Sequence, residues 1–251
     1  MLLAIDSGNT QTVFGLFDGA RLTDQFRVGT NRSHTRDELA VLLRAFVDLD
    51  GLEGIVLCTS VPTLVREYEG LAERWARTEL LVLGPNVQTG VTIRYDDPRE
   101  VGPDRIANAV AARERHGAPA VVVDFGTSTN FDVVNAEGDF AGGVVAPGVE
   151  ISMDALFQRA ARLSKVPFEA PERVISQTTT AAVQSGLVYG FAGQVDAIVT
   201  RILAELDAEG APVVATGGLS DLIAPHTRTI TAVDPELTLQ GLRLVWERNH
   251  R

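Results

Sequence analysis

A short acidic turn near the start of the chain carries residues that could do chemistry. Asp6 stands at the end of an apolar run within Met1–Phe17, and Ser-Gly-Asn-Thr follows at once over residues 7–10. In such a turn Gly8 lets a ligand approach the backbone, the polar side chains offer donors, and Asp6 can hold a metal ion or its water. This combination is typical of phosphate binding. A plain β-hairpin whose polar residues serve only turn geometry is the alternative.

A second copy of this unit favours phosphate binding. Ala120–Val133 again runs from an apolar strand to an aspartate, a glycine, a set of hydroxyl residues and a β-prone run. Internal repeats weigh heavily in fold prediction. Two such copies predict two similar halves, each contributing a carboxylate and a hydroxyl-lined turn to one cleft. The matched pairs are Asp6 with Asp124, Gly8 with Gly126, and Thr10 with Ser128.

A third carboxylate lies at a predicted helix start. Pro103 suits the first helical turn, so Asp104 and Arg105 fall at a helix N-terminus, where free amides and the dipole favour anions. The alternative is a first-turn carboxylate that only balances the dipole, with Arg105 solvated. Two glycine-rich stretches, 142–148 and 216–218, leave room for a ligand or nucleotide against the backbone, unless they are turns without function.

These residues need strands and helices to position them. Leu2–Ile5, Thr12–Phe17 and the run after Asp18-Gly19 predict antiparallel strands, and the capping box at 35–38 begins an amphipathic helix. Helices and strands then alternate, which predicts a mixed sheet of the ribonuclease-H-like kind. Gly117-Ala-Pro119 is the expected domain boundary. In the second half, the remaining predicted elements are helices at about 152–163, 179–208 and 238–248, and a strand at 211–215.

Composition limits the classes of function. The net charge of −11 opposes non-specific binding to nucleic acid or anionic membrane. No uninterrupted apolar run approaches roughly 20 residues, and Met1 leads directly into the first turn, so we expect a cytoplasmic protein without membrane contact. The single cysteine, Cys58, lies in an apolar run and predicts a buried free thiol. The apolar stripe of 179–208 predicts core packing or a subunit interface.

Six motifs in order resemble those of the type III pantothenate kinases, which belong to the acetate and sugar kinase, heat-shock 70 and actin superfamily. The resemblance covers nearly the whole chain. The motifs are Asp6–Thr10, Gly102–Arg105, Asp124–Thr129, Gly142–Gly148, Thr178–Thr180 with Gln184–Gly186, and Thr216–Gly218.

The resemblance implies ATP-dependent phosphorylation of pantothenate to 4′-phosphopantothenate, the first step of coenzyme A biosynthesis. It implies an α/β chain with a duplicated actin-like ATPase fold, two ribonuclease-H-like domains (1–116 and 117–251) with mixed sheets and antiparallel hairpin strands. It also implies a homodimer with the substrate site near the subunit interface, magnesium, and a monovalent cation, potassium or ammonium.

Carried over by position, the resemblance gives each motif residue a role. Asp104 would be the catalytic base, Asp124 would bind the monovalent cation, and Asp6 could hold magnesium. The expected ATP-binding residues are Asp6, Ser7, Gly8, Asn9, Thr10, Gln11, Thr12, Val13 and Thr127. The expected pantothenate-binding residues are Tyr95, Gly102, Pro103, Asp104, Arg105 and Thr179.

The chain departs from the family pattern at Ser7, Ser128, Asn130 and Thr178. The two serines are small and should be tolerated. Asn130 replaces a β-branched hydroxyl residue, so it could alter cation or nucleotide affinity or only change strand packing; we expect activity to survive. There are two alternative functions. The chain could be another small-molecule kinase of the same superfamily, or it could be a non-catalytic sensor of a nucleotide or metabolite.

Overall fold

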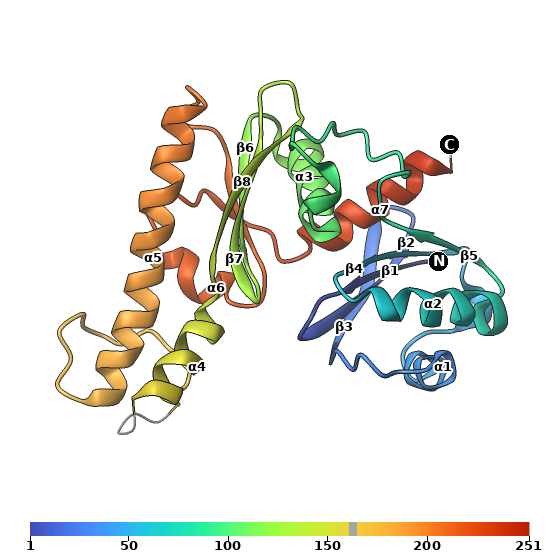
Figure 1. Cartoon of the computed structure of the whole chain (residues 1–251), viewed down its shortest axis with the longest axis horizontal. Helices are drawn as coiled ribbons and strands as arrows, with labels where there is room; N and C mark the ends of the chain where they lie inside the picture. Colours follow the sequence, from blue (N-terminus) through green and yellow to red (C-terminus); the bar gives the residue numbers. More distant parts are fainter. Residues whose placement is uncertain (161–164, 251) are drawn as a thin grey trace. The chain divides into compact units, whose positions relative to one another are not determined.

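The computed structural model describes residues 1–160 and 165–250, which divide into two compact units (Figure 1). Unit 1 comprises Met1–Ala111 and the segment from Leu237 onward, and unit 2 comprises Ala112–Glu236. Each unit contains one five-stranded mixed sheet. This confirms the predicted duplicated α/β architecture.

The sheet of unit 1 has the order β3-β2-β1-β4-β5. Its central strand, β1, pairs antiparallel with β2 and parallel with β4, as the hairpins followed by alternating helices and strands predicted. The strand is almost wholly buried, which explains its uninterrupted apolar run. The strands are β1 Leu2–Ser7, β2 Gln11–Asp18, β3 Arg21–Gly29, β4 Gly54–Thr59 and β5 Glu79–Val82.

Helices cover both faces of this sheet. On one face α1 (Arg36–Arg44) and α2 (Pro62–Leu71) pack over a core that includes Leu3 and Ile5. The predicted capping box begins α1: the Thr35 side chain accepts from the Glu38 amide, and Glu38 accepts from the Thr35 amide. On the other face lies α7 (Leu237–Asn249). The remaining helical elements are η1 Leu49–Gly51, the π-helix η2 Ala72–Ala76, η3 Pro98–Glu100, and α3 Pro103–His116, which ends in unit 2.

Unit 2 repeats the plan, with the strand order β10-β9-β6-β7-β8. Its central strand, β6, pairs antiparallel with β7 and parallel with β9. The long helix α5 packs on one face through Val188, Ala192 and Val195. The elements are β6 Ala120–Phe125, β7 Ser128–Val134, β8 Phe140–Pro147, α4 Val149–Arg159, α5 Thr179–Glu205, β9 Val213–Thr216, α6 Ser220–Ile223, η4 Ala224–His226 and β10 Ala232–Val233.

Two details of unit 2 differ from the sequence prediction. The glycine-rich stretch 142–148, predicted as room for a ligand, is mostly the edge strand β8, and Gly148 lies so close to the Thr127 carbonyl that a side chain would collide with it. The short elements α6 and β10 were not predicted. The end predicted for α4, at residue 163, falls outside the described residues.

The two units divide the chain differently from the predicted domains 1–116 and 117–251. The division falls within α3, and α7 joins unit 1 instead of the second half. Packing explains this: the Trp246 ring occupies the space that a side chain on Gly54 would fill, and the Ala107 carbonyl does the same at Gly241. The last helix therefore completes the first unit. The domain bounds 1–116 and 117–251 stay a prediction.

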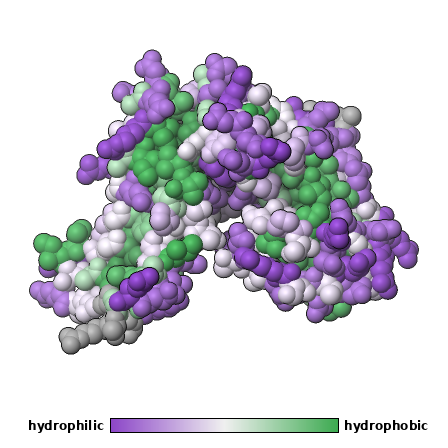
Figure 2. Space-filling view, viewed as in Figure 1, coloured by the Kyte–Doolittle hydropathy of each residue, from purple (hydrophilic) through white to green (hydrophobic). Residues whose placement is uncertain are grey.

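Among the described helices, α5 is the one long and apolar enough to cross a membrane by length and composition. Its mean hydropathy over 18 residues is 1.3, and 28% of that window is buried. Figure 2 shows apolar surface (green, upper left) in the part of unit 2 that contains α5 and β8. Core packing accounts for one side of the helix, so composition alone is weak evidence for a membrane span. The outer side carries Gly186, Gly190 and Gly193, beside which the structure leaves open space.

Candidate active site

Asp6 and Cys58 form a contact between neighbouring strands of unit 1. Asp6 in β1 stands opposite Val13 in β2 and Cys58 in β4. Residues at paired positions project from the same face of a sheet, so these three side chains share a face. The Cys58 thiol donates a hydrogen bond to Asp6 Oδ1, with a sulfur–oxygen distance of 3.2 Å. Cys58 is buried, as predicted, and it contacts the first acidic residue of the chain.

Asp104 lies near enough to the same thiol for its charge to act on it. It occupies the first turn of α3, where its Oδ1 accepts a hydrogen bond of 2.9 Å from the Arg105 amide. A Cβ on Gly102 would stand 2.5 Å from that oxygen, so the glycine makes room for the carboxylate. Burial raises the pKa of Cys58, and the nearby charges of Asp6 and Asp104 raise this pKa further. A protonated thiol therefore lies near both carboxylates.

The turn between β1 and β2 is tightly built. The Gly8 amide donates to the Gln11 carbonyl at 3.0 Å, and a Cβ on Gly8 would lie 3.1 Å from that oxygen. Thr30, just after β3, fixes the turn from outside: its amide donates to the Thr10 carbonyl at 2.9 Å, and its hydroxyl donates to the Gly8 carbonyl at 2.8 Å. The backbone around Gly8 is thereby held in one shape, as a phosphate-binding turn requires.

Two of the predicted ATP-binding residues, Ser7 and Thr12, have buried side chains. The Ser7 hydroxyl lies 3.2 Å from that of Thr12, which lies 2.9 Å from that of Thr30. Tyr68 packs beside them, and burial raises its pKa despite hydrogen bonds with the two hydroxyls, which lower it. This hydroxyl cluster supports the turn from inside the core. The side chains of Ser7 and Thr12 therefore shape the turn and do not face solvent.

The second acidic turn lies in unit 2. Asp124 in β6 stands opposite Asn130 in β7 and Thr216 in β9. Gly217 has a φ of +89°, and a Cβ there would lie 2.5 Å from Asp124 Oδ1. The Gly126 amide closes the turn on the Ser128 carbonyl at 3.0 Å. The predicted repeat thus has a structural counterpart, in which a glycine from outside the repeat, Gly217, approaches the carboxylate.

The residues of unit 2 that depart from the family pattern form local hydrogen bonds. The Ser128 hydroxyl donates to Asn130 Oδ1 at 2.9 Å, so the two unusual residues of this turn contact each other. Thr178 is the N-cap of α5, where its hydroxyl accepts from the Ala181 amide at 3.2 Å. Threonine serves this position as asparagine would, because either side chain offers an oxygen to the first turn.

The remaining predicted substrate residues belong to both units. Unit 1 contains half-buried Tyr95, in the loop before η3, and Pro103 and Arg105 at the start of α3. Unit 2 contains exposed Thr179, the first residue of α5, and exposed Thr127. The structure brings together Asp6 and Asp104 within unit 1. A cleft shared with Asp124 stays a prediction.

The chain matches the family model described as type III pantothenate kinase over residues 2–201. The chain belongs to the type III pantothenate kinase family. A relative of that name from Acidothermus cellulolyticus is 52% identical over 99% of each chain, and one from Moorella thermoacetica is 48% identical over 99% of this chain and 100% of the other. Membership of this kinase family confirms the resemblance drawn from the motifs.

Solved structures share the fold at low identity. A Campylobacter jejuni protein named for the Baf family of transcriptional activators has a TM-score of 0.61 at 20% identity, covering 99% of this chain and 98% of that one. A ROK hexokinase from Thermus thermophilus has a TM-score of 0.52 at 15% identity, covering 97% of each chain. At such identities the likeness shows the fold alone, and it agrees with the predicted actin-like ATPase architecture.

A type III pantothenate kinase uses ATP with a divalent metal, and the oxygen donors of this chain fit such a role. Among the described residues there is no group of three or more His, Cys, Asp or Glu side chains that could enclose a metal. Magnesium in kinases needs no such cage, since one or two carboxylates and the substrate's phosphates suffice. Asp6, at the end of β1 beside the first turn, offers one such carboxylate.

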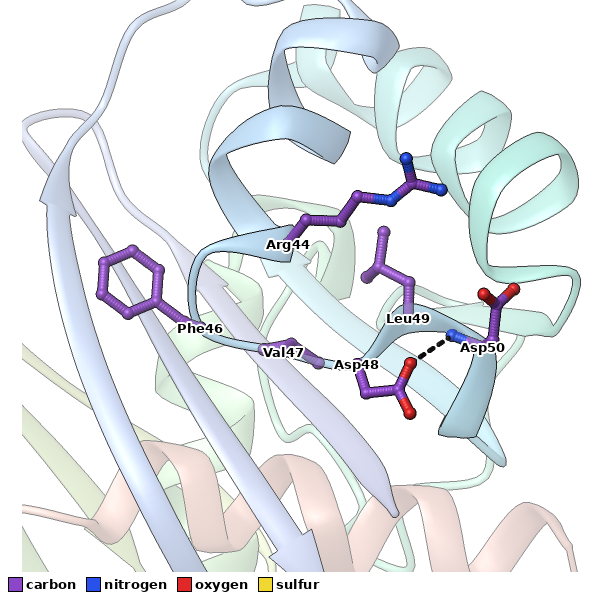
Figure 3. A pocket seen from close by; sticks show the side chains of 6 residues that line it. All are labelled: Arg44, Phe46, Val47, Asp48, Leu49 and Asp50. Carbon is purple, nitrogen blue, oxygen red and sulfur yellow. Dashed lines mark hydrogen bonds between the residues drawn. The ribbon is translucent and has the colours of Figure 1, made fainter.

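A hollow elsewhere in unit 1 contains none of the predicted site residues. Figure 3 shows it in the connection from α1 to β4, with the Phe46 ring pointing away from the other side chains. The amide of Asp50 donates to Asp48 Oδ1 at 3.3 Å, which fixes the local turn. The hollow is lined by Arg44, Phe46, Val47, Asp48, Leu49 and Asp50. We assign no part of the kinase site to it.

Sequence reasoning did not find the role of Cys58 as a donor to Asp6. The apolar run around Cys58 indicated burial, but the contact depends on the parallel register of β1 with β4, 52 positions apart in the chain. No local pattern encodes that register. Thr30 was missed for the same reason, because its contacts with Gly8 and Thr10 follow from the pairing of β2 with β3.

Proposed function

We propose that this chain transfers the γ-phosphoryl group of ATP to the hydroxyl group of pantothenate, forming 4′-phosphopantothenate in the first step of coenzyme A biosynthesis. The observation that carries the proposal is that one buried thiol contacts Asp6 and lies within reach of the charge of Asp104, in a member of the type III pantothenate kinase family. In this proposal Asp6 serves the nucleotide and Asp104 serves the alcohol.

Asp104 is the proposed base. The pantothenate hydroxyl oxygen forms a bond to the γ-phosphorus while the bond to the β–γ bridging oxygen breaks, and ADP leaves with that electron pair. The hydroxyl proton passes to the Asp104 carboxylate, which the Arg105 amide holds in place. Phosphoryl transfer depends chiefly on positioning and charge neutralisation, so a single oriented carboxylate is sufficient.

The turn from Asp6 to Val13, together with Thr127, is the proposed ATP-binding element. The rigid backbone around Gly8 supports this role, because successive amides in a tight turn attract phosphate oxygens. Asp6 would hold magnesium, which supplies charge neutralisation between the phosphates. Ser7 and Thr12 contribute by fixing the turn from the core.

Asp124 is the proposed ligand of a monovalent cation, potassium or ammonium. Gly217 has no side chain to cover Asp124 Oδ1, so a carboxylate oxygen of the kind that suits a hard cation lies beside open backbone. The neighbouring Ser128–Asn130 contact supports retention of activity, because Asn130 is held by a hydroxyl within the same turn.

Pantothenate would contact Tyr95, Gly102, Pro103, Arg105 and Thr179, and we propose a cytoplasmic homodimer that completes this site. The outer side of α5 supports a dimer, because its three glycines leave open space for close helix packing. No nucleic acid or membrane partner is proposed. Light scattering after gel filtration measures the mass directly: we expect twice 26.9 kDa, and a monomer at micromolar concentration would contradict the dimer.

A coupled assay with pantothenate, ATP, magnesium and potassium tests the function. Formation of ADP with stoichiometric 4′-phosphopantothenate, identified by mass, is the expected result. A panel of other small alcohols and sugars distinguishes a different kinase of the superfamily, which would prefer another acceptor. Binding of ATP without turnover of any acceptor would support a nucleotide sensor and refute the kinase proposal.

A further inference from the structure

Two arginines donate hydrogen bonds to side chains of the first acidic turn. Arg27 in β3 donates from Nη1 to Gln11 Oε1 at 3.1 Å, and Arg32, after β3, donates from Nη2 to Asn9 Oδ1 at 3.0 Å. Both arginines are exposed. The family resemblance gave roles to Asn9 and Gln11 but none to these two cations. Their contacts place positive charge at the tip of the turn.

The sheet register places Arg27 on the same face as Asp6. Arg27 pairs with Val13, Val13 pairs with Asp6, and Asp6 pairs with Cys58. Paired side chains share a face, so one row of the sheet carries a cation, an apolar residue, a carboxylate and a thiol in order. Neighbouring strands are about 4.8 Å apart, so the backbones of Arg27 and Asp6 are separated by about 10 Å.

The partners of these arginines are neutral. Within residues 1–160 and 165–250, neither Arg27 nor Arg32 forms an ion pair with a carboxylate, whereas Arg99 and Arg115 do. Amide oxygens orient a guanidinium group without neutralising it, and each guanidinium has five N–H donors in all. Both groups can therefore bind an anion.

The segment joining the two arginines is fixed to the turn. Thr30 lies between them and hydrogen-bonds the carbonyls of Gly8 and Thr10. Because the backbone of this segment is held against the turn, the two guanidinium groups need little rearrangement to meet a ligand there. Such preorganisation lowers the entropic cost of binding.

We propose that Arg27 and Arg32 bind the phosphate groups of the nucleotide and give the first turn its preference for the triphosphate. This inference rests on the proposed function, in which residues 6–13 take ATP. Arginine matches phosphate geometry through paired N–H donors, and charge-assisted hydrogen bonds are stronger than neutral ones. The two arginines thus supply local positive charge that an acidic protein needs to bind an anionic substrate.

Nucleotide binding to matched variants tests the inference. Calorimetry measures the affinity of the full chain for adenosine, AMP, ADP and a non-hydrolysable ATP analogue with magnesium. Arg27→Gln and Arg32→Gln should each weaken binding of the ATP analogue about 10-fold, and the double variant should weaken it further. The loss should be smaller for ADP and absent for adenosine. An equal loss for all four ligands would overturn the inference, because adenosine has no phosphate group for the arginines to bind.

Two controls isolate charge at the turn. Arg21→Gln removes the same charge from the opposite end of β3 and should leave all affinities unchanged. Arg27→Lys keeps a cation and should recover part of the lost affinity. In steady-state assays the KM for ATP should rise in Arg27→Gln and Arg32→Gln, while the KM for pantothenate stays constant.

The outcomes separate this inference from the proposed function. Unchanged affinity for the ATP analogue in both glutamine variants would overturn the role of the arginines while leaving the kinase intact. A rise confined to the KM for pantothenate would overturn it too, since the arginines would then bind the pantothenate carboxylate. If wild-type protein binds the analogue but phosphorylates no pantothenate, the proposed function fails. The binding series then still tests whether the two arginines bind the phosphate groups. If wild-type protein binds no nucleotide, both proposals fail.

Discussion

The two sheets follow one plan but hold their acidic residues differently. In each unit the central strand pairs antiparallel with the next strand of a hairpin and parallel with a later strand. Asp6 and Asp124 occupy corresponding positions. The parallel neighbour of Asp6 is Cys58, which donates a hydrogen bond to it, whereas the parallel neighbour of Asp124 is Thr216.

The turns that follow these acidic residues also differ. The last strand pair before the turn is Ser7 with Thr12 in unit 1 and Phe125 with Thr129 in unit 2, so the second turn is one residue shorter. The longer turn is fastened from outside by Thr30. The shorter turn is instead crowded by glycine backbone at Gly148, and Gly217 crowds Asp124.

This difference suggests how a duplicated unit can divide two tasks. A longer turn with amides, hydroxyls and nearby arginines suits a multiply charged anion. A short turn whose carboxylate lies against backbone suits a cation. We therefore expect variants of the two turns to fail in different ways, and the following four experiments measure this in order of expected effect.

The largest effect should follow loss of the proposed base in unit 1. Asp104→Asn should lower kcat by about 100-fold or more, because an amide cannot accept the hydroxyl proton. Asparagine can still accept the hydrogen bond from the Arg105 amide, so the melting temperature should change little. Steady-state kinetics and a thermal melt give both values.

Asp97→Asn is the matched control for that variant. Asp97 is a loop carboxylate that pairs with Arg99, and its removal should leave kcat unchanged. Wild-type turnover in Asp104→Asn would exclude Asp104 as the base.

The next largest effect should separate the two turn carboxylates. Asp6→Asn should raise the magnesium concentration needed for half-maximal activity by about 10- to 100-fold, since loss of a metal-site interaction has that effect. Asp124→Asn should leave the magnesium requirement unchanged and abolish the preference for potassium over sodium. Titrations of each variant with both cations measure this. If the two variants respond alike, the proposed division between the turns is wrong.

A smaller effect should follow loss of the thiol that contacts Asp6. Cys58→Ala removes the donor, and the magnesium requirement should rise about 5-fold, as expected for one weak hydrogen bond. Cys58→Ser restores a donor and should recover most of the loss. Ile55→Val removes one carbon from the opposite face of the same strand and should change stability without changing the magnesium requirement. Equal magnesium requirements in all three variants would refute a positioning role.

The smallest effect concerns helix caps, which also differ between the units. Hydrogen bonds from the Thr35 amide and hydroxyl lower the pKa of Glu38 below the ordinary value of a glutamate side chain. A lowered pKa in the folded state stabilises the protein above the unfolded-state pKa, and this contribution is lost as the pH falls through the folded-state pKa. Glu38→Gln should therefore lower the melting temperature by no more than about 2 °C near neutral pH and by less below pH 4.5.

The cap of α5 provides the contrast, because it uses the Thr178 hydroxyl, which does not titrate. Thr178→Ala should lower the melting temperature by a similar amount at every pH. A pH-independent effect of Glu38→Gln would contradict the charged capping box.

Local signals predicted most of the fold. The capping box at Thr35, the apolar run of β1 and the repeated acidic turn each act over a few residues, and the structure contains all three elements. Long-range packing decided the rest. The assignment of α7 to unit 1 depends on Trp246 filling the space beside Gly54, and two adjacent glycines concealed the strand β8.

The candidate site was predictable as a set of motifs but not as a set of contacts. The aspartates and glycines could be named because phosphate-binding turns need those residue types in that order. Their partners could not, because Cys58, Thr30 and Arg27 reach the turn through strand register, which has no local sequence signature. Residue types therefore predicted which side chains could bind phosphate. The residues that hold those side chains in place could be identified only from the strand pairing.

The position of α7 has a consequence for synthesis of the chain. Unit 2 ends at Glu236, so its whole sequence is translated before the helix that covers Gly15 and Gly54 of unit 1. Until that helix has been made and released from the ribosome, one face of the earlier sheet lacks its cover. A stop codon before Leu237 would therefore damage the half of the protein that was made first, and nascent chains of that length should recruit chaperones through the uncovered face.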